Sequence, residues 1–352
     1  MTDFEISPAQ RDLEALAKEF ARRRLAPQAR SAERALGPPE GLGEAFSSLE
    51  LALVAVPESL GGMGEPLLTA ALVEQALAEG DLGLVLALGA PADAPVAVAA
   101  AVPDAAAARR LMAPCALCLA ADVRLGPGPR LDGRVTGVPG AGRHGILTWA
   151  RGEGRGWLVR VEPDAPGRRV RPLRAAMGLR AAELSDVELE EAAIDPEAAW
   201  PVTAAQLARA AAVQRLLGAA RLVGVGRAAL AEAVAYASRR RAFGEVIARH
   251  QGVGFLLADM WVALEEAWAL VWLACAGGWD DEGFVRRAED AWALARRAAG
   301  AVTSDAVGVL GGAGYMADAP VEKFFRDAHT YGSLVGAWDP GVLAAQAPPW
   351  TP

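Results

Sequence analysis

Apolar and polar residues recur with helical spacing through the first third of the chain. Over residues 8–35 the apolar side chains fall on one side and a run of arginines falls largely off it, which predicts an amphipathic helix that ends near Pro27. Helices are also expected over 39–51 and 67–80. The apolar stretch 82–102 is interrupted by an aspartate and two prolines, so it predicts a buried pair of helices and no membrane insertion.

A different pattern begins at residue 116. Short apolar runs separated by glycine, proline and arginine predict a small all-β unit that ends near residue 194. Long helical patterns then return, as is typical of a helix bundle. The predicted bundle helices cover 203–240, 250–276, 281–309 and 320–330. The expected fold class is therefore α+β, with a helical domain over 1–114, a reduced central β-domain over 115–199 and a C-terminal helix bundle over 200–352.

Composition narrows the classes of partner. The 352 residues carry a formal net charge of −8, which argues against a nucleic-acid partner because phosphate binding requires a surplus of basic residues. Cys115, Cys118 and Cys275 are too few for a disulfide framework, and no signal peptide is recognised, which together indicate a cytoplasmic protein. Cys115 and Cys118 are half of a zinc site that nothing completes, so they are expected to be packing residues and no metal is expected.

Three glycine-rich segments require separate interpretations. Gly140–Gly145 has the letters of a dinucleotide fingerprint, but a strand pattern follows it, so a β-turn is expected. Gly224–Ala229 lies inside a helical run, where glycines allow close helix packing. Gly311–Tyr315 follows a helix, where a glycine-rich C-cap is the ordinary interpretation, although its exposed backbone N–H groups could also receive an anion.

Several motifs at consistent spacing resemble the acyl-CoA dehydrogenase family. Tyr236–Gln251, Gly311–Tyr315 and Arg326–His329 resemble its C-terminal domain. Pro57–Gly64 resembles a Pro-Glu-x-x-Gly-Gly-x-Gly turn of that family, and Gly178–Arg180 resembles the end of its β-domain. The resemblance covers nearly the entire chain. It implies an N-terminal helical domain, a small central β-barrel and a C-terminal four-helix bundle.

The resemblance also implies a missing catalytic base. The family removes the α-proton of an acyl-CoA with a glutamate while FAD accepts the β-hydride. That glutamate stands in a Tyr-Glu-Gly-Thr loop, where this chain has Val335, or just before a helical arginine, where it has Gln214 before Arg215. Neither valine nor glutamine can abstract a proton, so no catalytic residue is assigned. Asp339 could replace the base only in a reshaped loop.

The flavin ring site is expected to be lost as well. The family places Thr-Glu-Pro-x-x-Gly-Ser-Asp and Trp-Ile-Thr around the ring, where this chain has Leu119–Gly126 and Gly137–Pro139. The hydroxyl groups and the aromatic side chain that would hold the ring are absent from both segments. We therefore expect that this cleft holds neither the flavin ring nor the substrate productively.

The other half of the flavin site is retained. In the family, FAD spans a subunit interface, and its pyrophosphate and adenosine contact the helix bundle of the neighbouring subunit. By resemblance these FAD contacts fall on Arg240, Phe243, Gly244, Gln251, Gly311, Gly312 and Gly314. Guanidinium suits the pyrophosphate contact of Arg240, although alone this residue would be interpreted as one solvated arginine in a basic run. Gly308 stands where the family often has glutamine, so one adenosine contact is in question.

Other residues of the bundle are given structural roles. Arg215 and Arg326 are expected to form ion pairs. Trp261, Trp268 and Trp272 fall near helical spacing and are expected in the bundle core or an interface.

The leading hypothesis is a subunit of a heteromeric, α2β2 acyl-CoA dehydrogenase. The chain would lack its own base, give FAD contacts to a catalytic partner subunit and be inactive alone, as in the similar actinobacterial enzymes that act on steroid side-chain CoA thioesters. An electron-transfer flavoprotein or a similar protein would accept the electrons. Two alternatives stay open: a self-sufficient homomeric dehydrogenase that uses Asp339, and a flavin-free pseudoenzyme scaffold.

Overall fold

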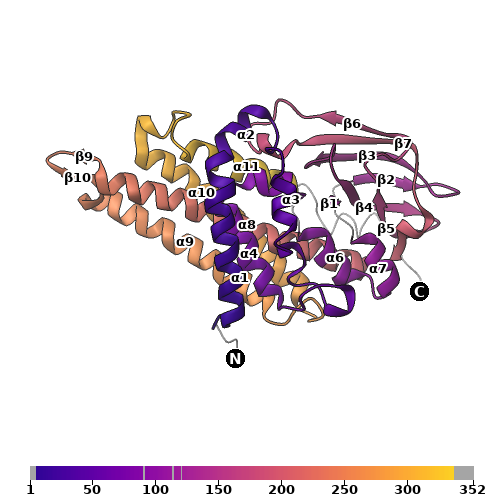
Figure 1. Cartoon of the computed structure of the whole chain (residues 1–352). Coiled ribbons are helices and arrows are strands. Elements are labelled where there is room, and N and C mark those ends of the chain that lie inside the picture. The colour runs from indigo at the N-terminus through magenta and orange to yellow at the C-terminus, as the bar shows by residue number, and fades with distance from the viewer. Residues whose placement is uncertain (1–4, 90–91, 113–114, 120, 337–352) are drawn as a thin grey trace.

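The computed structural model describes residues 5–89, 92–112, 115–119 and 121–336. They form an N-terminal set of helices, a central sheet and a C-terminal helix bundle, with the sheet at one end of the molecule (Figure 1). The N-terminal helices are α1 (Pro8–Phe20), α2 (Ala29–Ala35), α3 (Leu42–Ser47), α4 (Leu67–Gly80), α5 (Leu82–Ala87), α6 (Asp93–Ala101) and α7 (Ala105–Leu111). The apolar stretch predicted as a buried helix pair forms α5 and α6, both almost entirely buried.

The helical path does not end near Pro27, so that prediction is wrong. After α1, which begins at a Ser7 capping box, the backbone continues through a π-helical turn over Ala21–Leu25 and a 3₁₀ turn over Ala26–Gln28 into α2. Proline is tolerated because it stands in the first turn of a new hydrogen-bonding register, where its missing N–H leaves no helical bond unmade.

Eight strands form the central sheet. They are β1 (Cys115–Leu117), β2 (Ala121–Leu125), β3 (Arg130–Val138), β4 (Gly145–Gly152), β5 (Arg155–Val161), β6 (Arg168–Pro172), β7 (Ser185–Ala193) and β8 (Ala199–Val202). Their order is β6-β7-β3-β2-β4-β5-β8, with β1 paired in parallel to β4. The element expected as a small barrel is thus a sheet with an open path. Its edge strand β6 is rich in exposed arginine and ends in proline, features that discourage further pairing.

The last strand also moves a domain boundary. β8 pairs antiparallel to β5, with Ala199 opposite Val159 and Val202 opposite Gly156. The sheet therefore continues to Val202, beyond the expected boundary at residue 199. Gly140 begins the tight turn before β4, as predicted for that glycine-rich segment. Its carbonyl oxygen accepts the N–H of His144, which closes the turn, and its own N–H donates to Ala182 O.

The C-terminal bundle follows the sequence pattern closely. Its helices are α8 (Ala204–Arg239), α9 (Gln251–Cys275), α10 (Phe284–Leu310) and α11 (Val321–Gly336). The glycines inside α8 allow close packing, as expected. A Cβ on Gly224 would stand 2.2 Å from the Gln75 carbonyl oxygen of α4, and one on Gly226 would stand 2.4 Å from Leu264 Cδ2 of α9.

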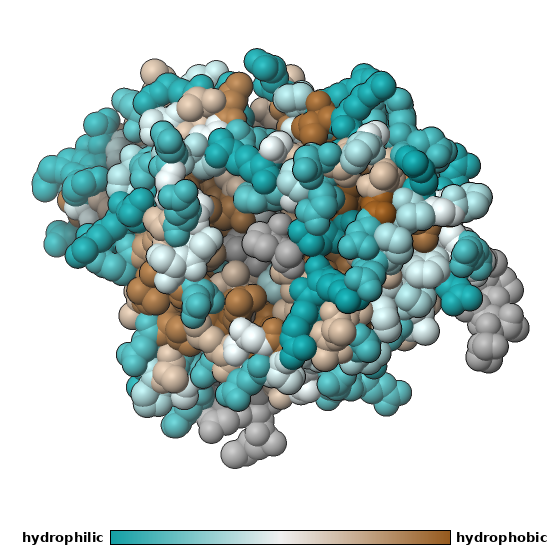
Figure 2. Space-filling model, turned by 45° about the vertical axis from the view of Figure 1, so that its right-hand side comes forward, coloured by the Kyte–Doolittle hydropathy of each residue, from teal (hydrophilic) through white to brown (hydrophobic). Residues whose placement is uncertain are grey.

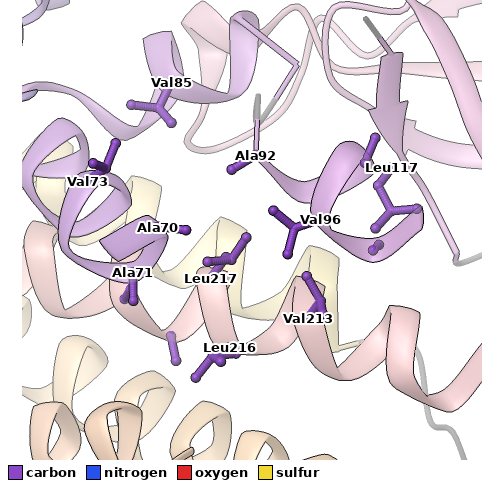
Figure 3. Close-up of a cluster of buried hydrophobic side chains, with 14 of the residues drawn as sticks. Ala70, Ala71, Val73, Val85, Ala92, Val96, Leu117, Val213, Leu216 and Leu217 are labelled. Carbon is purple, nitrogen blue, oxygen red and sulfur yellow. The ribbon is translucent and has the colours of Figure 1, made fainter. Parts of the chain in front are cut away.

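The main hydrophobic core joins the N-terminal helices to the bundle. In Figure 3, Ala70 of α4, Val96 of α6 and Leu217 of α8 point into one cluster, which also receives Leu117 from β1. Each of the first three side chains is fully buried. On the face drawn in Figure 2, hydrophilic residues dominate the periphery and hydrophobic residues gather toward the centre and lower left. The sheet is therefore held against a helical framework that fixes its position.

None of the described helices combines the length and apolar character that crossing a bilayer requires. No three His, Cys, Asp or Glu side chains in the described ranges are grouped so as to hold a metal ion. Cys115 and Cys118 are buried, and burial raises the pKa of the Cys115 thiol to about 12, which keeps it protonated.

Candidate functional site

The two positions expected to carry a base lie in the same cavity. Gln214 of α8 and Val335 of the last turn of α11 line a cavity of about 40 Å³, together with Leu119 and Gly137 from the sheet. The sequence places these four residues far apart, so the fold brings them together. Sites for small organic ligands are typically about 300–1,000 Å³ in volume, so this one holds only a few water molecules.

One contact closes the cavity on the side of the sheet. Leu334 Cδ1 lies 2.2 Å from the point where a Cβ on residue 137 would stand, so only glycine leaves room for this leucine. Gly137 also has a φ of 66°, a conformation that favours glycine, and its N–H donates to Asp186 Oδ1 at 3.1 Å. α11 thus inserts an apolar side chain beside the segment where the family has Trp-Ile-Thr.

Neither base position offers a basic group. The Gln214 amide Nε2 donates to the Leu117 carbonyl oxygen at 2.7 Å, which ties α8 to β1. Val335 is half-buried and contributes only methyl groups. Asp339, the alternative base, lies outside the described residues.

A buried carboxylate that sequence reasoning did not select also lines the cavity. Asp93 receives two hydrogen bonds from Arg221, at 2.7 Å from Nη2 and 3.0 Å from Nη1, and Arg221 also bonds Glu74 and Tyr331. Burial raises the pKa of Asp93 to about 6, and the Arg221 charge opposes that rise. Asp93 is therefore engaged by a fixed cation and is not a free base. Its signal in the sequence was a charge inside an apolar stretch.

Two hydroxyl groups lie beside the cavity, and sequence reasoning missed both. The Tyr331 hydroxyl accepts a hydrogen bond from Arg221 Nη1. Thr136 lines the cavity next to Gly137 and is exposed. Among the described residues of Leu119–Gly126, only Leu119 reaches the cavity, and it is 1% exposed. The residues present do not fit a flavin ring, because the space is too small and its walls are mainly apolar.

The pyrophosphate-contact candidates lie in a hairpin after α8. The strands β9 (Arg241–Ala242) and β10 (Glu245–Val246) are joined by Phe243 and Gly244, whose φ values of 53° and 92° are those of a tight hairpin turn. Phe243 is 96% exposed. Arg240 is exposed and forms no ion pair within the described part of the chain, whereas Arg241 Nη2 donates to Gly244 O at 2.7 Å. The end of α8 and the hairpin turn therefore expose the Arg240 guanidinium and the Phe243 ring to solvent.

The glycine loop follows α10. Gly311 and Gly312 are exposed in a 3₁₀ turn, with a φ of 57° at Gly311. Gly314 is buried, and a Cβ there would stand 2.5 Å from the Val307 carbonyl oxygen. Gln251 is exposed at the start of α9, and Gly308 faces open space. The N–H of Gly311 donates to the Gly308 carbonyl oxygen and the N–H of Gly314 donates to the Gly311 carbonyl oxygen, so both are used within the loop. The Gln251 side-chain amide is accessible to a ligand.

The structure does not bring the two sets of candidates together within one chain. Gln214 and Arg240 are 26 positions apart along α8, which spans about 39 Å at 1.5 Å per residue. Figure 1 shows the β9–β10 hairpin at the end of the bundle opposite the sheet. The two sets of candidates therefore lie toward opposite ends of the bundle.

The residues given structural roles behave mostly as expected. Arg215 forms an ion pair with Glu289, and Arg326 pairs with Glu33 and Glu322 at 2.6 Å each. Trp268 and Trp272 are buried at 8% and 7% exposure, whereas Trp261 is 57% exposed. The first two belong to the core and the third remains available to an interface.

Two family models match this chain, one over the N-terminal helices and one over the C-terminal bundle. The family model described as acyl-CoA dehydrogenase, N-terminal domain, matches residues 7–115, and that described as acyl-CoA dehydrogenase, C-terminal domain, matches residues 204–338. The chain is 29% identical to 3-sulfinopropanoyl-CoA desulfinase from Paraburkholderia xenovorans, over 93% of this chain and 92% of that relative.

Solved structures share the whole fold. Butyryl-CoA dehydrogenase from Megasphaera elsdenii has a TM-score of 0.85 at 22% identity, covering 97% of this chain and 100% of that one. A chain of the ChsE4-ChsE5 complex from Mycobacterium tuberculosis has a TM-score of 0.81 at 22% identity, covering 98% and 100%. At this level of identity, the likeness concerns the fold alone.

Proposed function

Because this chain belongs to the acyl-CoA dehydrogenase family, whose members are normally FAD-dependent oxidoreductases, we propose that it is the non-catalytic subunit of a heteromeric member. The assembly would be α2β2 and cytoplasmic. Its catalytic partner would supply the glutamate base, the ring site and the acyl-CoA pocket. This chain would supply contacts to the FAD pyrophosphate and adenosine.

The separation of the two half-sites carries the proposal. The end near the sheet has a small cavity whose described lining offers no free base, and the far end has an exposed arginine, phenylalanine and glycine loop. A chain that used its own flavin would need a cleft for the ring. A chain that completes a neighbour's flavin site needs only the far end.

Each retained residue suits one part of that task. Arg240 offers planar donors that match the oxygens of a pyrophosphate. The exposed glycines Gly311 and Gly312 let a ligand approach the backbone closely, and the Phe243 ring offers a flat apolar face. The dehydrogenation chemistry, in which the substrate loses an α-proton to a base and a β-hydride to FAD, would belong to the partner.

The substrate class and the electron acceptor are parts of the same proposal. The substrate is an acyl-CoA thioester, and the steroid side-chain thioester is the finer version that the fold shared with the ChsE4-ChsE5 complex favours by analogy. An electron-transfer flavoprotein or a similar carrier would reoxidise the flavin.

Flavin content tests the proposal most directly. The chain purified alone should carry little flavin, and its co-expression with a dehydrogenase from a neighbouring gene should give a yellow, active complex. In that complex, Arg240→Ala should weaken FAD retention about tenfold, because a charge-assisted contact to the pyrophosphate is lost. Arg239→Ala is the matched control, since this adjacent arginine is equally exposed. Stoichiometric FAD and turnover in the isolated chain would overturn the proposal.

A second candidate function follows from the desulfinase relative. That protein's name describes removal of a sulfinate group from an acyl-CoA, a reaction other than dehydrogenation, and the alignment covers most of both chains. Release of sulfite from 3-sulfinopropanoyl-CoA by the isolated chain would support it. The small volume of the cavity favours the subunit proposal, because an acyl-CoA substrate is much larger than this space.

The two remaining alternatives have their own tests. A self-sufficient homomeric dehydrogenase would lose acyl-CoA oxidation on Asp339→Asn. A flavin-free scaffold would form the same complex, and Arg240→Ala would leave its flavin content unchanged.

A further inference from the structure

A second, larger hollow lies between the end of α2 and the edge of the sheet. Its volume is about 520 Å³, within the range of about 300–1,000 Å³ that is usual for small-molecule sites. The end of α2, the turn before β4, the edge strand β6 and the segment 173–185 enclose it. The hollow is separate from the cavity that contains Gln214 and Val335.

The charge of this hollow is opposite to that of the whole chain. Arg143, Arg174, Arg180 and Glu183 are the charged side chains that line it. Arg143 donates two hydrogen bonds to the Glu183 carboxylate, at 2.6 Å from Nε and 3.1 Å from Nη2, so the charge of that carboxylate is neutralised. Arg174 and Arg180 are exposed and form no ion pair or hydrogen bond within the described part of the chain. A local surplus of two positive charges thus stands in a protein whose net charge is −8.

The rest of the lining is apolar except for Ser185. Leu179 and Leu184 form a buried floor, at 0% and 6% exposure. Val170 and Leu173 stand at the rim with 36% and 40% of their surfaces exposed to solvent. Partly exposed large apolar side chains beside two free guanidinium groups suit a ligand that has both a charged and an apolar part.

The backbone around the hollow is held in uncommon conformations. Leu36, Leu179 and Glu183 all line it and have φ values of 60°, 55° and 52°. A non-glycine residue in this region costs about 1–3 kcal/mol, and such residues persist where the surrounding structure fixes them. Leu179 is fixed from the bundle, because Asp327 accepts its N–H at 2.6 Å. The hollow is therefore preformed.

We propose that this hollow binds a small amphipathic anion, with a carboxylate or phosphate group between Arg174 and Arg180 and an apolar chain along Leu173 and Leu184. The anionic group receives charge-assisted hydrogen bonds from the two guanidinium groups. The chain covers apolar surface that water otherwise contacts. The site is independent of the flavin contacts on the hairpin, so it stands or falls separately from the proposed subunit role.

Calorimetric titration of the full chain with octanoate tests the proposal. Saturable binding of one octanoate is expected, with affinity that falls as salt is raised because the guanidinium groups are exposed. Arg174→Ala and Arg180→Ala should each weaken binding about tenfold, as expected when a charged hydrogen-bond donor is lost. Arg124→Ala is the matched control, since Arg124 is also exposed and unpaired in the described residues but lies on β2 away from this hollow.

Further ligands separate the two parts of the binding energy. Acetate and inorganic phosphate carry the charge without the chain, and octan-1-ol carries the chain without the charge; each should bind at least tenfold more weakly than octanoate. Octyl phosphate distinguishes a phosphate from a carboxylate preference. The proposal is overturned if octanoate gives no saturable binding, if octan-1-ol binds as tightly, or if Arg124→Ala weakens binding as much as the two lining variants.

Discussion

At the scale of single residues, Gly137 helps to set the shape of the small cavity that Gln214 and Val335 line. Its positive φ and the lack of a Cβ let Leu334 lie against the sheet, where the family has an aromatic ring-binding segment. Residues from both the sheet and α11 therefore limit the size of this cavity.

Gly137→Ala should destabilise the chain by about 1–3 kcal/mol, because alanine is strained at this φ and its Cβ collides with Leu334. Chemical denaturation of the full chain measures the loss. Adding Gly137→Ala to Leu334→Ala should cost less stability than adding Gly137→Ala to the unmodified chain, because the collision is then absent. Gly43→Ala is the control, since a Cβ at Gly43 meets nothing within 4 Å. An unchanged midpoint for Gly137→Ala would contradict this account.

Sequence motifs located some of these residues and could not locate others. Val335 and Gln214 were found because each stands at a fixed distance from a recognisable motif. Asp93 was not found, because its partner Arg221 lies 128 positions away and no local pattern records such a pair. The collision between Leu334 and a Cβ at residue 137 is equally invisible in the sequence.

At the scale of elements, Lys323 joins three parts of the fold. It lies on α11 and is 2% exposed, with its ammonium group bonded to Asp81, the N-cap of α5, and at 2.6 Å to Asp327. Asp327 also accepts the N–H of Leu179 in the segment before β7. Burial opposes the Lys323 charge, but the two carboxylates outweigh it and raise the pKa of the ammonium group above its usual value.

Lys323→Met should cost about 3–5 kcal/mol, because it leaves two buried carboxylates side by side without a cation. Lys18→Met is a matched control, since Lys18 is the only other lysine and forms an exposed pair with Glu14 on α1. Removal of such a surface pair changes stability by about 1 kcal/mol or less. Equal losses for the two variants, measured by denaturant unfolding, would show that the buried cluster has no special role.

Elements with a strong period of their own were predictable, and those that depend on neighbours were not. α8 and α10 each repeat a helical pattern over many turns, so their bounds agree with the prediction to within a few residues. The π-helical turn before Pro27 changes the backbone hydrogen-bonding register without changing the hydrophobic pattern. Whether the ends of a sheet pair with each other depends on strand order, which a single sequence does not specify.

At the scale of the whole molecule, the apolar surface left on the bundle is consistent with the proposed subunit role. Phe255 and Trp261 of α9 are 65% and 57% exposed, and Val234 of the adjacent α8 is 43% exposed. Large aromatic side chains of this kind are enriched at protein interfaces. They lie on the same helices that lead to the hairpin with Arg240, so a partner that covers them would reach the candidate flavin contacts.

Phe255→Ser should therefore weaken assembly with the catalytic partner at least tenfold while leaving the isolated chain folded, because the side chain is exposed before assembly and buried after it. Light scattering of the co-expressed complex across a dilution series measures the association, and thermal unfolding of the isolated chain checks the fold. Leu16→Ser on α1 is the control, since Leu16 is also an exposed large apolar residue, at 39%, on another helix. If Phe255→Ser leaves assembly intact while Arg240→Ala still releases flavin, the flavin contacts survive and only this interface is misplaced. If neither variant has an effect, the neighbouring subunit does not approach this end of the bundle, and the subunit proposal fails with it.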